Sequence, residues 1–125
     1  PILWMLNRNR DEYHDALTSA RKYLIESQND DGSWFYELEG FPCLPSAELQ
    51  SALALQCCLY CGLGPDNETV SKGINWLLDK QMADGHWDGG YFPIKGIQKK
   101  EDIYATSQAL ITLHQYWLLK NNKDM

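Results

Sequence analysis

Apolar and small residues recur at helical spacing in four segments of the chain. They form stripes, three or four positions apart, at about residues 11–28, 46–61, 69–81 and 102–121. A helix of about 3.6 residues per turn places such positions on one side. No segment alternates between apolar and polar positions over more than a few residues, as a half-buried strand would. The pattern predicts an all-α protein with four main helices.

Each stripe contains the side chains that we expect to face the core. They are Tyr13, Ala16, Leu17, Ala20 and Leu24 in the first segment, Leu49, Ala52, Leu53, Cys57 and Tyr60 in the second, Val70, Gly73, Ile74 and Leu77 in the third, and Ile103, Leu110, Leu113 and Trp117 in the fourth. Gly62 ends the second segment, and Pro65 begins a turn. We therefore expect one domain over residues 1–125, built of two helical hairpins at about 11–64 and 65–121.

Two short stretches, QNDDGSW and QMADGHW, share one pattern at a distance of 53 residues. The match extends upstream, where the pair Tyr23-Leu24 corresponds to the pair Trp76-Leu77. A fixed period of this kind predicts repeated units that pack against one another. The residues common to both stretches are Gln28, Gly32 and Trp34 in the first, and Gln81, Gly85 and Trp87 in the second.

These shared residues fit a structural turn. A glutamine amide can donate to the free carbonyls of a helix end, a glycine permits the positive φ of a sharp turn, and an indole can cover the turn against the next hairpin. The adjacent carboxylates Asp30 and Asp31 suggest a metal or acid site instead. However, Ala83 stands opposite Asp30 in the second stretch, so the carboxylate pair is not the repeated element. We expect a structural role and no metal site.

The charge and the spacing of the cysteines exclude several classes of partner and of metal site. The formal net charge of -6 disfavours nucleic acid and anionic membranes as partners, because both bind clustered Lys and Arg. No apolar run approaches the ~20 residues of a transmembrane helix. The four cysteines and three histidines lack zinc-site spacing. We expect small buried thiols, no cofactor and a cytoplasmic protein, and the first residue, Pro1, suggests a piece of something longer.

The second stretch and its surroundings resemble a known motif. KGINWLLDKQMADGHW is similar to the QW motif of squalene and oxidosqualene cyclases, and ARKYLIESQNDDGSW is a slightly degenerate copy. The resemblance implies the α/α toroid of terpenoid cyclases and protein prenyltransferases, in which helical hairpins form two layers around an apolar cavity. It also implies that the QW motifs tie the outer layer together and are not catalytic.

The resemblance does not extend to the catalytic motifs of these families. Class II cyclases carry their acid in D-x-D-D-T-A, and the best match is DIYATS at 102–107, with Tyr104 in place of the protonating Asp. In the first hairpin, Glu48 of LPSAE falls near the position of the motif's Thr. Ala105 occupies the place of the zinc-binding His of the prenyltransferases. The chain also lacks D-D-x-x-D and the G-C-G-E-Q of thioester domains.

Three functions fit this pattern. The first is a cyclase-like toroid segment without its own acid, which binds an isoprenoid or other apolar ligand within a larger or oligomeric assembly. The second is a piece of an active terpenoid cyclase whose acid lies outside these residues. The third is a helical-repeat domain that binds proteins. Self-association or the remainder of a longer chain would cover the ends of the repeat. The candidate catalytic residues are Asp102, Tyr104 and Glu48, and the candidate ligand-binding residues are Phe35, Tyr91 and Phe92.

Overall fold

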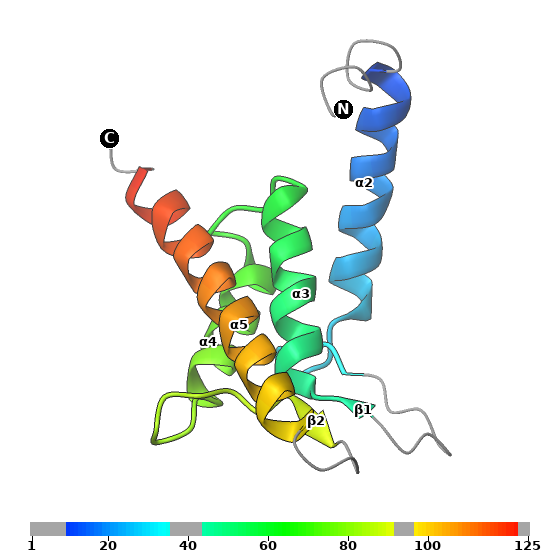
Figure 1. The fold of residues 1–125 in the computed structure, drawn as a ribbon. Helices are drawn as coiled ribbons and strands as arrows, with labels where there is room; N and C mark the ends of the chain where they lie inside the picture. The colour runs from blue at the N-terminus through cyan, green and yellow to red at the C-terminus, as the bar shows by residue number, and fades with distance from the viewer. Residues whose placement is uncertain (1–9, 36–43, 92–96, 123–125) are drawn as a thin grey trace.

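A computed structural model describes residues 10–35, 44–91 and 97–122, and Figure 1 shows their arrangement. The elements are α2 (Arg10–Ser27), β1 (Leu44–Pro45), α3 (Ala47–Tyr60), α4 (Glu68–Asp79), β2 (Gly90–Tyr91) and α5 (Ile97–Asn122). The predicted all-α class is confirmed, since the described strands are two residues long and form one antiparallel pair.

Local sequence explains most of the helix boundaries. The Ser46 side chain accepts a hydrogen bond from the backbone N–H of Leu49 and so caps the start of α3. The Asn67 side chain caps α4 in the same way through the N–H of Thr69. Gly62, with a φ of 93°, follows the end of α3.

The start of α5 differs from the prediction. This helix begins at Ile97, whereas the apolar stripe predicted a start at about residue 102. Its first turns carry the polar run Gln98–Glu101, and a polar run has no apolar stripe by which a helix can be located. As a result, Asp102 lies inside the helix and not at its beginning.

Helix α3 is the centre of the fold. It makes its most extensive contacts with α5, then with α4, and its fewest with α2. In Figure 1, α3 stands between α5 and α2, and the two helices α3 and α5 run in the same direction. The buried apolar side chains are Trp34, Leu49, Ala52, Leu55, Cys58, Leu59, Cys61, Val70, Ile74, Trp76, Leu77, Trp87, Ala105 and Ala109.

The buried face of α5 is not the one that the apolar stripe predicted. Large residues such as Leu110 and Trp117 are more than half exposed, and so is Ile103. The side chains buried against the rest of the fold are the small Ala105, Ala109 and Thr112, and the Thr112 hydroxyl donates to the Ala52 carbonyl of α3 at 2.9 Å. Small side chains allow the two helices to pack closely. Leu113 of the predicted stripe is partly buried against the core, whereas Ile103, Leu110 and Trp117 remain on open surface.

The strand pair joins the two long connections of the chain. Leu44 pairs with Tyr91, and the Ser46 N–H donates to the Gly89 carbonyl at 3.2 Å. The pair therefore holds the beginnings of α3 and α5 at one end of the molecule. None of the described helices is long and apolar enough to cross a membrane.

Candidate functional site

The first Gln-Gly-Trp turn, residues 28–34, joins two helices. The Gln28 amide donates to the carbonyl of Gly32 within the turn and to the carbonyl of Thr69 in α4, both at 2.9 Å. The indole N–H of Trp34 donates to the Leu24 carbonyl at 3.0 Å, near the end of α2. Gly32 adopts a φ of 101°, which glycine reaches at little cost. The turn thus ties the end of α2 to the start of α4.

The carboxylate in this turn has a local structural partner. Asp31 accepts hydrogen bonds from the N–H and the hydroxyl of Ser33, at 3.0 and 2.6 Å. These two hydrogen bonds lower the pKa of Asp31, with smaller contributions from the charge of Lys80 and the side chain of Trp76. No group of three metal-binding side chains is found within residues 10–35, 44–91 and 97–122.

The second turn, residues 81–87, has the same internal geometry. The Gln81 amide donates to the Gly85 carbonyl at 2.9 Å, and the Trp87 indole donates to the Leu77 carbonyl at 2.8 Å. Gly85 also has a φ of 101°. Asp84 pairs with the imidazole of His86 in place of the serine of the first turn. This hydrogen bond raises the pKa of His86 and lowers that of Asp84.

Hydrogen bonds from the two tryptophan backbones identify equivalent positions on α3 and α5. The N–H of Trp34 donates to the Ser51 hydroxyl of α3, and the N–H of Trp87 donates to the Thr106 hydroxyl of α5, both at 2.9 Å. Ser51 is therefore the counterpart of Thr106, which corrects the sequence alignment that placed Glu48 near that position. Ser51 and Thr106 are 55 residues apart in sequence, whereas the two turns are 53 residues apart. The connection from the second turn to α5 is therefore two residues longer than the connection from the first turn to α3.

The three candidate catalytic residues have different surroundings. Asp102 accepts a hydrogen bond from the Gly89 N–H at 2.8 Å and so positions the second connection. Tyr104, two positions further along α5, points about 200° around the helix from Asp102 and is exposed. Glu48 is half-buried at the start of α3, where burial and the charge of Asp88 raise its pKa. Asp102 and Tyr104 therefore do not face one space.

Of the three candidate aromatic residues, the structure describes the side chain of Phe35. Phe35 is exposed and lines a groove of about 410 Å³ between α2 and α3, together with Tyr23 and Trp34. Tyr91 belongs to β2 through its backbone, and its side chain is not described. Phe92 lies outside the described residues.

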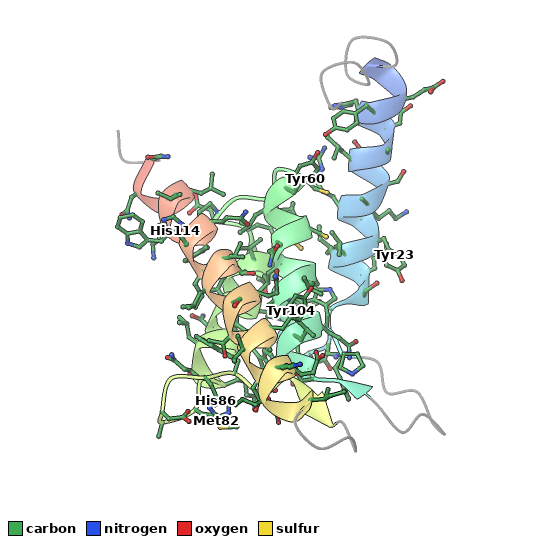
Figure 2. The ribbon with its side chains drawn as sticks, in the orientation of Figure 1. Tyr23, Tyr60, Met82, His86, Tyr104 and His114 are labelled. Carbon is green, nitrogen blue, oxygen red and sulfur yellow. The ribbon has the colours of Figure 1, made fainter. Side chains whose placement is uncertain are left out.

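The structure instead reveals an apolar surface along α3 and α5. We call it the α3–α5 face, and it comprises Leu53 and Tyr60 of α3 and Tyr104, Ile111 and Leu118 of α5, all of which are exposed. Figure 2 shows Tyr60 at the upper end of α3 and Tyr104 lower down, beside α5. At the Tyr60 end the face contains a groove of about 350 Å³, which Leu118, Leu119 and Gln115 also line. The site is therefore open, elongated and mostly apolar.

Only Tyr104 of this face was among the predicted site residues. A signal for the others is present in the sequence, because Tyr104, Ile111 and Leu118 follow one another at intervals of seven residues. That spacing keeps side chains on one line of a helix. In the middle of the face, the Gln56 amide donates to the Gln108 side-chain oxygen at 2.8 Å and joins α3 to α5.

The four helices of the described residues, with their two equivalent Gln-Gly-Trp turns, define a helical-repeat protein of the terpenoid cyclase type. The sequence model of the squalene-hopene cyclase C-terminal domain matches residues 2–117, and the chain belongs to this family. The predicted resemblance is confirmed.

Several curated proteins are similar to the chain. A squalene-hopene cyclase of Zymomonas mobilis is 35% identical over 86 residues, which are 63% of this chain and 13% of that protein. A lanosterol synthase of Candida albicans is 28% identical over 91 residues, 69% of this chain and 12% of that protein. A squalene-hopene cyclase of Bradyrhizobium diazoefficiens is 27% identical over 135 aligned residues, 98% of this chain and 20% of that protein. The chain thus spans a fifth or less of each relative, and no solved structure matches it.

Proposed function

We propose that the α3–α5 face binds an isoprenoid or a similarly apolar ligand, as one wall of a cavity that further helices complete. The observation that supports this is the exposure of Tyr60, Tyr104 and Ile111 along one pair of helices. A contiguous apolar surface on a folded domain is costly to leave in water and commonly marks a binding site. The relatives are named as squalene-hopene cyclases and a lanosterol synthase, which indicates a polycyclic terpenoid chemistry for them.

The shape of the face agrees with a shared cavity. A small-molecule site usually encloses most of its ligand, whereas the groove at Tyr60 is open and has a volume of only about 350 Å³. One pair of helices therefore covers one side of an extended apolar molecule. The two tyrosines add aromatic rings to this wall, and aromatic faces also attract cationic centres.

We further propose that this segment binds its ligand without protonating it. A cyclising acid must be a strong proton donor held within reach of the substrate. Asp102 already accepts the Gly89 N–H, on the side of α5 away from Tyr104. Glu48 holds its proton more tightly than an ordinary carboxyl, because its pKa is raised. Asp102 therefore lacks the position, and Glu48 lacks the acid strength, that the reaction needs.

Binding of squalene in detergent micelles, followed by NMR chemical shifts of the isotope-labelled chain, tests the proposal. We expect saturable shifts that map to Tyr104, Ile111 and Leu118, and a loss of binding in Ile111→Asp. The matched control is Leu78→Asp, because Leu78 is equally exposed but lies on α4. Equal effects of the two variants, or no saturation, would contradict the binding site. Formation of a cyclised product by this chain would contradict the absence of an acid.

A further inference from the structure

Helix α4 packs into a groove formed by the first turn and α3, and we call this groove the seat of α4. A Cβ atom at Gly73 would lie 2.6 Å from the end of the Leu55 side chain and 3.0 Å from the Trp34 ring, so a larger residue there requires the flexible Leu55 side chain to shift. Helix α2 carries Ala20 at the equivalent position, and the exposed Leu110, the counterpart of Leu55, has room for such a shift. A Cβ atom at Gly32 would lie 2.6 Å from the carbonyl oxygen of Lys72. The backbones of the turn and of α4 are therefore in direct contact. The Gln28 hydrogen bond to Thr69 completes this seat.

The second turn and α5 form an equivalent seat, in which none of the described helices lies. In its place is a cavity of about 390 Å³, lined by Asp84, His86, Lys99, Asp102, Ile103, Thr106, Ser107 and Leu110. We call this cavity the open seat. A Cβ atom at Gly85 would meet no described atom within 4 Å. Leu110 is 54% exposed, whereas its counterpart Leu55 is completely buried.

Helix α2, at the other end of the described fold, does not pack into an equivalent groove of the described residues. By the period of 53 residues, α2 corresponds to α4, and Tyr23 corresponds to Trp76. Trp76 is 9% exposed and Tyr23 72%. Figure 2 shows Tyr23 on α2, far from the end of α5 where His86 lies. Leu17 and Leu24 are likewise only half-buried, while their counterparts Val70 and Leu77 are completely buried.

We propose that the open seat takes α2 of a second copy of this chain, so that copies associate head to tail. The contact between α3 and α4 within the chain supplies the geometry, because it is the same seat with its helix in place. The Gln81 amide then donates to the Ala16 carbonyl of the second copy, as Gln28 donates to Thr69. Tyr23 of the second copy lies beside Asp84, as Trp76 lies beside Asp31.

The proposed contact differs from the ligand-binding surface. On α5, the open seat includes Ile103, Ser107 and Leu110, whereas the α3–α5 face includes Tyr104, Ile111 and Leu118. These two sets form adjacent but separate stripes along one helix, since neighbouring positions are about 100° apart. The two ends that meet are also different, and such an interface forms either a closed ring or an extending fibre.

Sedimentation of the chain at increasing concentration tests this association. We expect wild type to form dimers and larger assemblies. Tyr23→Asp and Leu110→Asp each remove one side of the contact, and we expect at least about 30-fold weaker association for either, as for a central interface residue. The matched controls, Ile25→Asp and Leu78→Asp, leave it unchanged, because both positions are exposed but lie outside the contact.

A mixture of the two blocked variants gives the sharpest test. Tyr23→Asp retains an intact open seat, and Leu110→Asp retains an intact α2, so together they form a one-to-one dimer that does not grow. Both substituted side chains are exposed, and circular dichroism checks that each variant folds. A wild-type chain that stays monomeric at every concentration, or two variants that do not pair, would overturn the proposal and assign the seat to a helix outside these residues.

Discussion

The two Gln-Gly-Trp turns have the same geometry in different surroundings. Both glycines have a φ of 101°, and both glutamines donate to the glycine carbonyl at 2.9 Å. The hydrogen bonds Asn29 N–H to Ser33 and Met82 N–H to His86 are both 2.8 Å long. Yet the first turn is covered by α4 and the second lies beside an open cavity.

This difference distinguishes what the turn sequence determines from what a neighbouring helix determines. The turn geometry recurs in the second turn, which has no described helix lying over it, so a covering helix is not required for this geometry. The burial of the residues around the turn depends on the helix that lies over it. Leu55 and Leu110 occupy equivalent places on α3 and α5, and only Leu55 is buried. Substitutions at equivalent positions should therefore have unequal effects.

The largest difference is expected between Leu55→Ala and Leu110→Ala. Loss of the fully buried Leu55 side chain leaves a cavity beneath α4, which costs about 2–5 kcal/mol of unfolding free energy. Loss of the half-exposed Leu110 should cost less than about 1 kcal/mol in the monomer. Urea unfolding at low protein concentration measures both values. Equal losses of unfolding free energy would mean that Leu55 of α3 and Leu110 of α5 have equivalent surroundings.

The next difference concerns the turn glycines. Alanine at Gly85 must adopt a positive φ, which costs about 1–2 kcal/mol. Alanine at Gly32 bears the same cost and also displaces the Lys72 carbonyl, which adds about 1–3 kcal/mol. Thermal and urea unfolding of Gly32→Ala and Gly85→Ala give this comparison. If Gly85→Ala is the more damaging, the second turn is not open.

A smaller difference is expected between the glutamines. Gln28→Ala removes two hydrogen bonds, one of them to α4, and should cost about 1–3 kcal/mol. Gln81→Ala removes the hydrogen bond to Gly85 and should cost about 0.5–1.5 kcal/mol. The conservative variants Gln28→Glu and Gln81→Glu keep the side-chain length but lose the donor. If Gln28→Glu behaves as wild type, the amide donor is not responsible for the effect.

The sequence allowed the helices to be predicted more fully than their contacts. Four apolar stripes located α2 to α5, and the period of 53 residues located both turns. The face by which α5 packs was predicted wrongly, because its large residues Leu110 and Trp117 resemble a core stripe while small residues make the contact. Whether a leucine is buried depends on a neighbouring helix, which the leucine and its local sequence do not specify.

The candidate site was harder to predict for a related reason. Asp102 and Tyr104 are close in sequence, and a motif comparison groups them. On a helix, two positions apart means nearly opposite sides, so the pair cannot act on one ligand. The face that gathers Tyr60 and Ile111 comes from two helices, and its composition depends on how α3 and α5 pack. The seven-residue spacing within α5 was the available signal, and it identifies three of the five residues of this face.

The smallest difference between the turns is their response to pH. The folded state raises the pKa of His86 above its ordinary value of about 6.5, mainly through the hydrogen bond to Asp84. Protonated His86 therefore favours folding, and this contribution is complete below about pH 6.5 and is lost as the pH rises through the raised pKa. The first turn has Ser33 at the equivalent position and loses nothing in this range.

Titration of the His86 imidazole by NMR measures this effect directly. We expect Asp84→Asn to move its pKa back toward the ordinary value, and Asp31→Asn, the matched control in the first turn, to leave it unchanged. His86→Ser makes the second turn resemble the first and should flatten the fall in melting temperature between about pH 6 and 8. Below that range both turns lose stability as Asp31 and Asp84 protonate, since their pKa values are lowered in the folded state. A His86 titration that Asp84→Asn leaves unchanged would show that the pair does not form in solution, and the two turns would then respond alike.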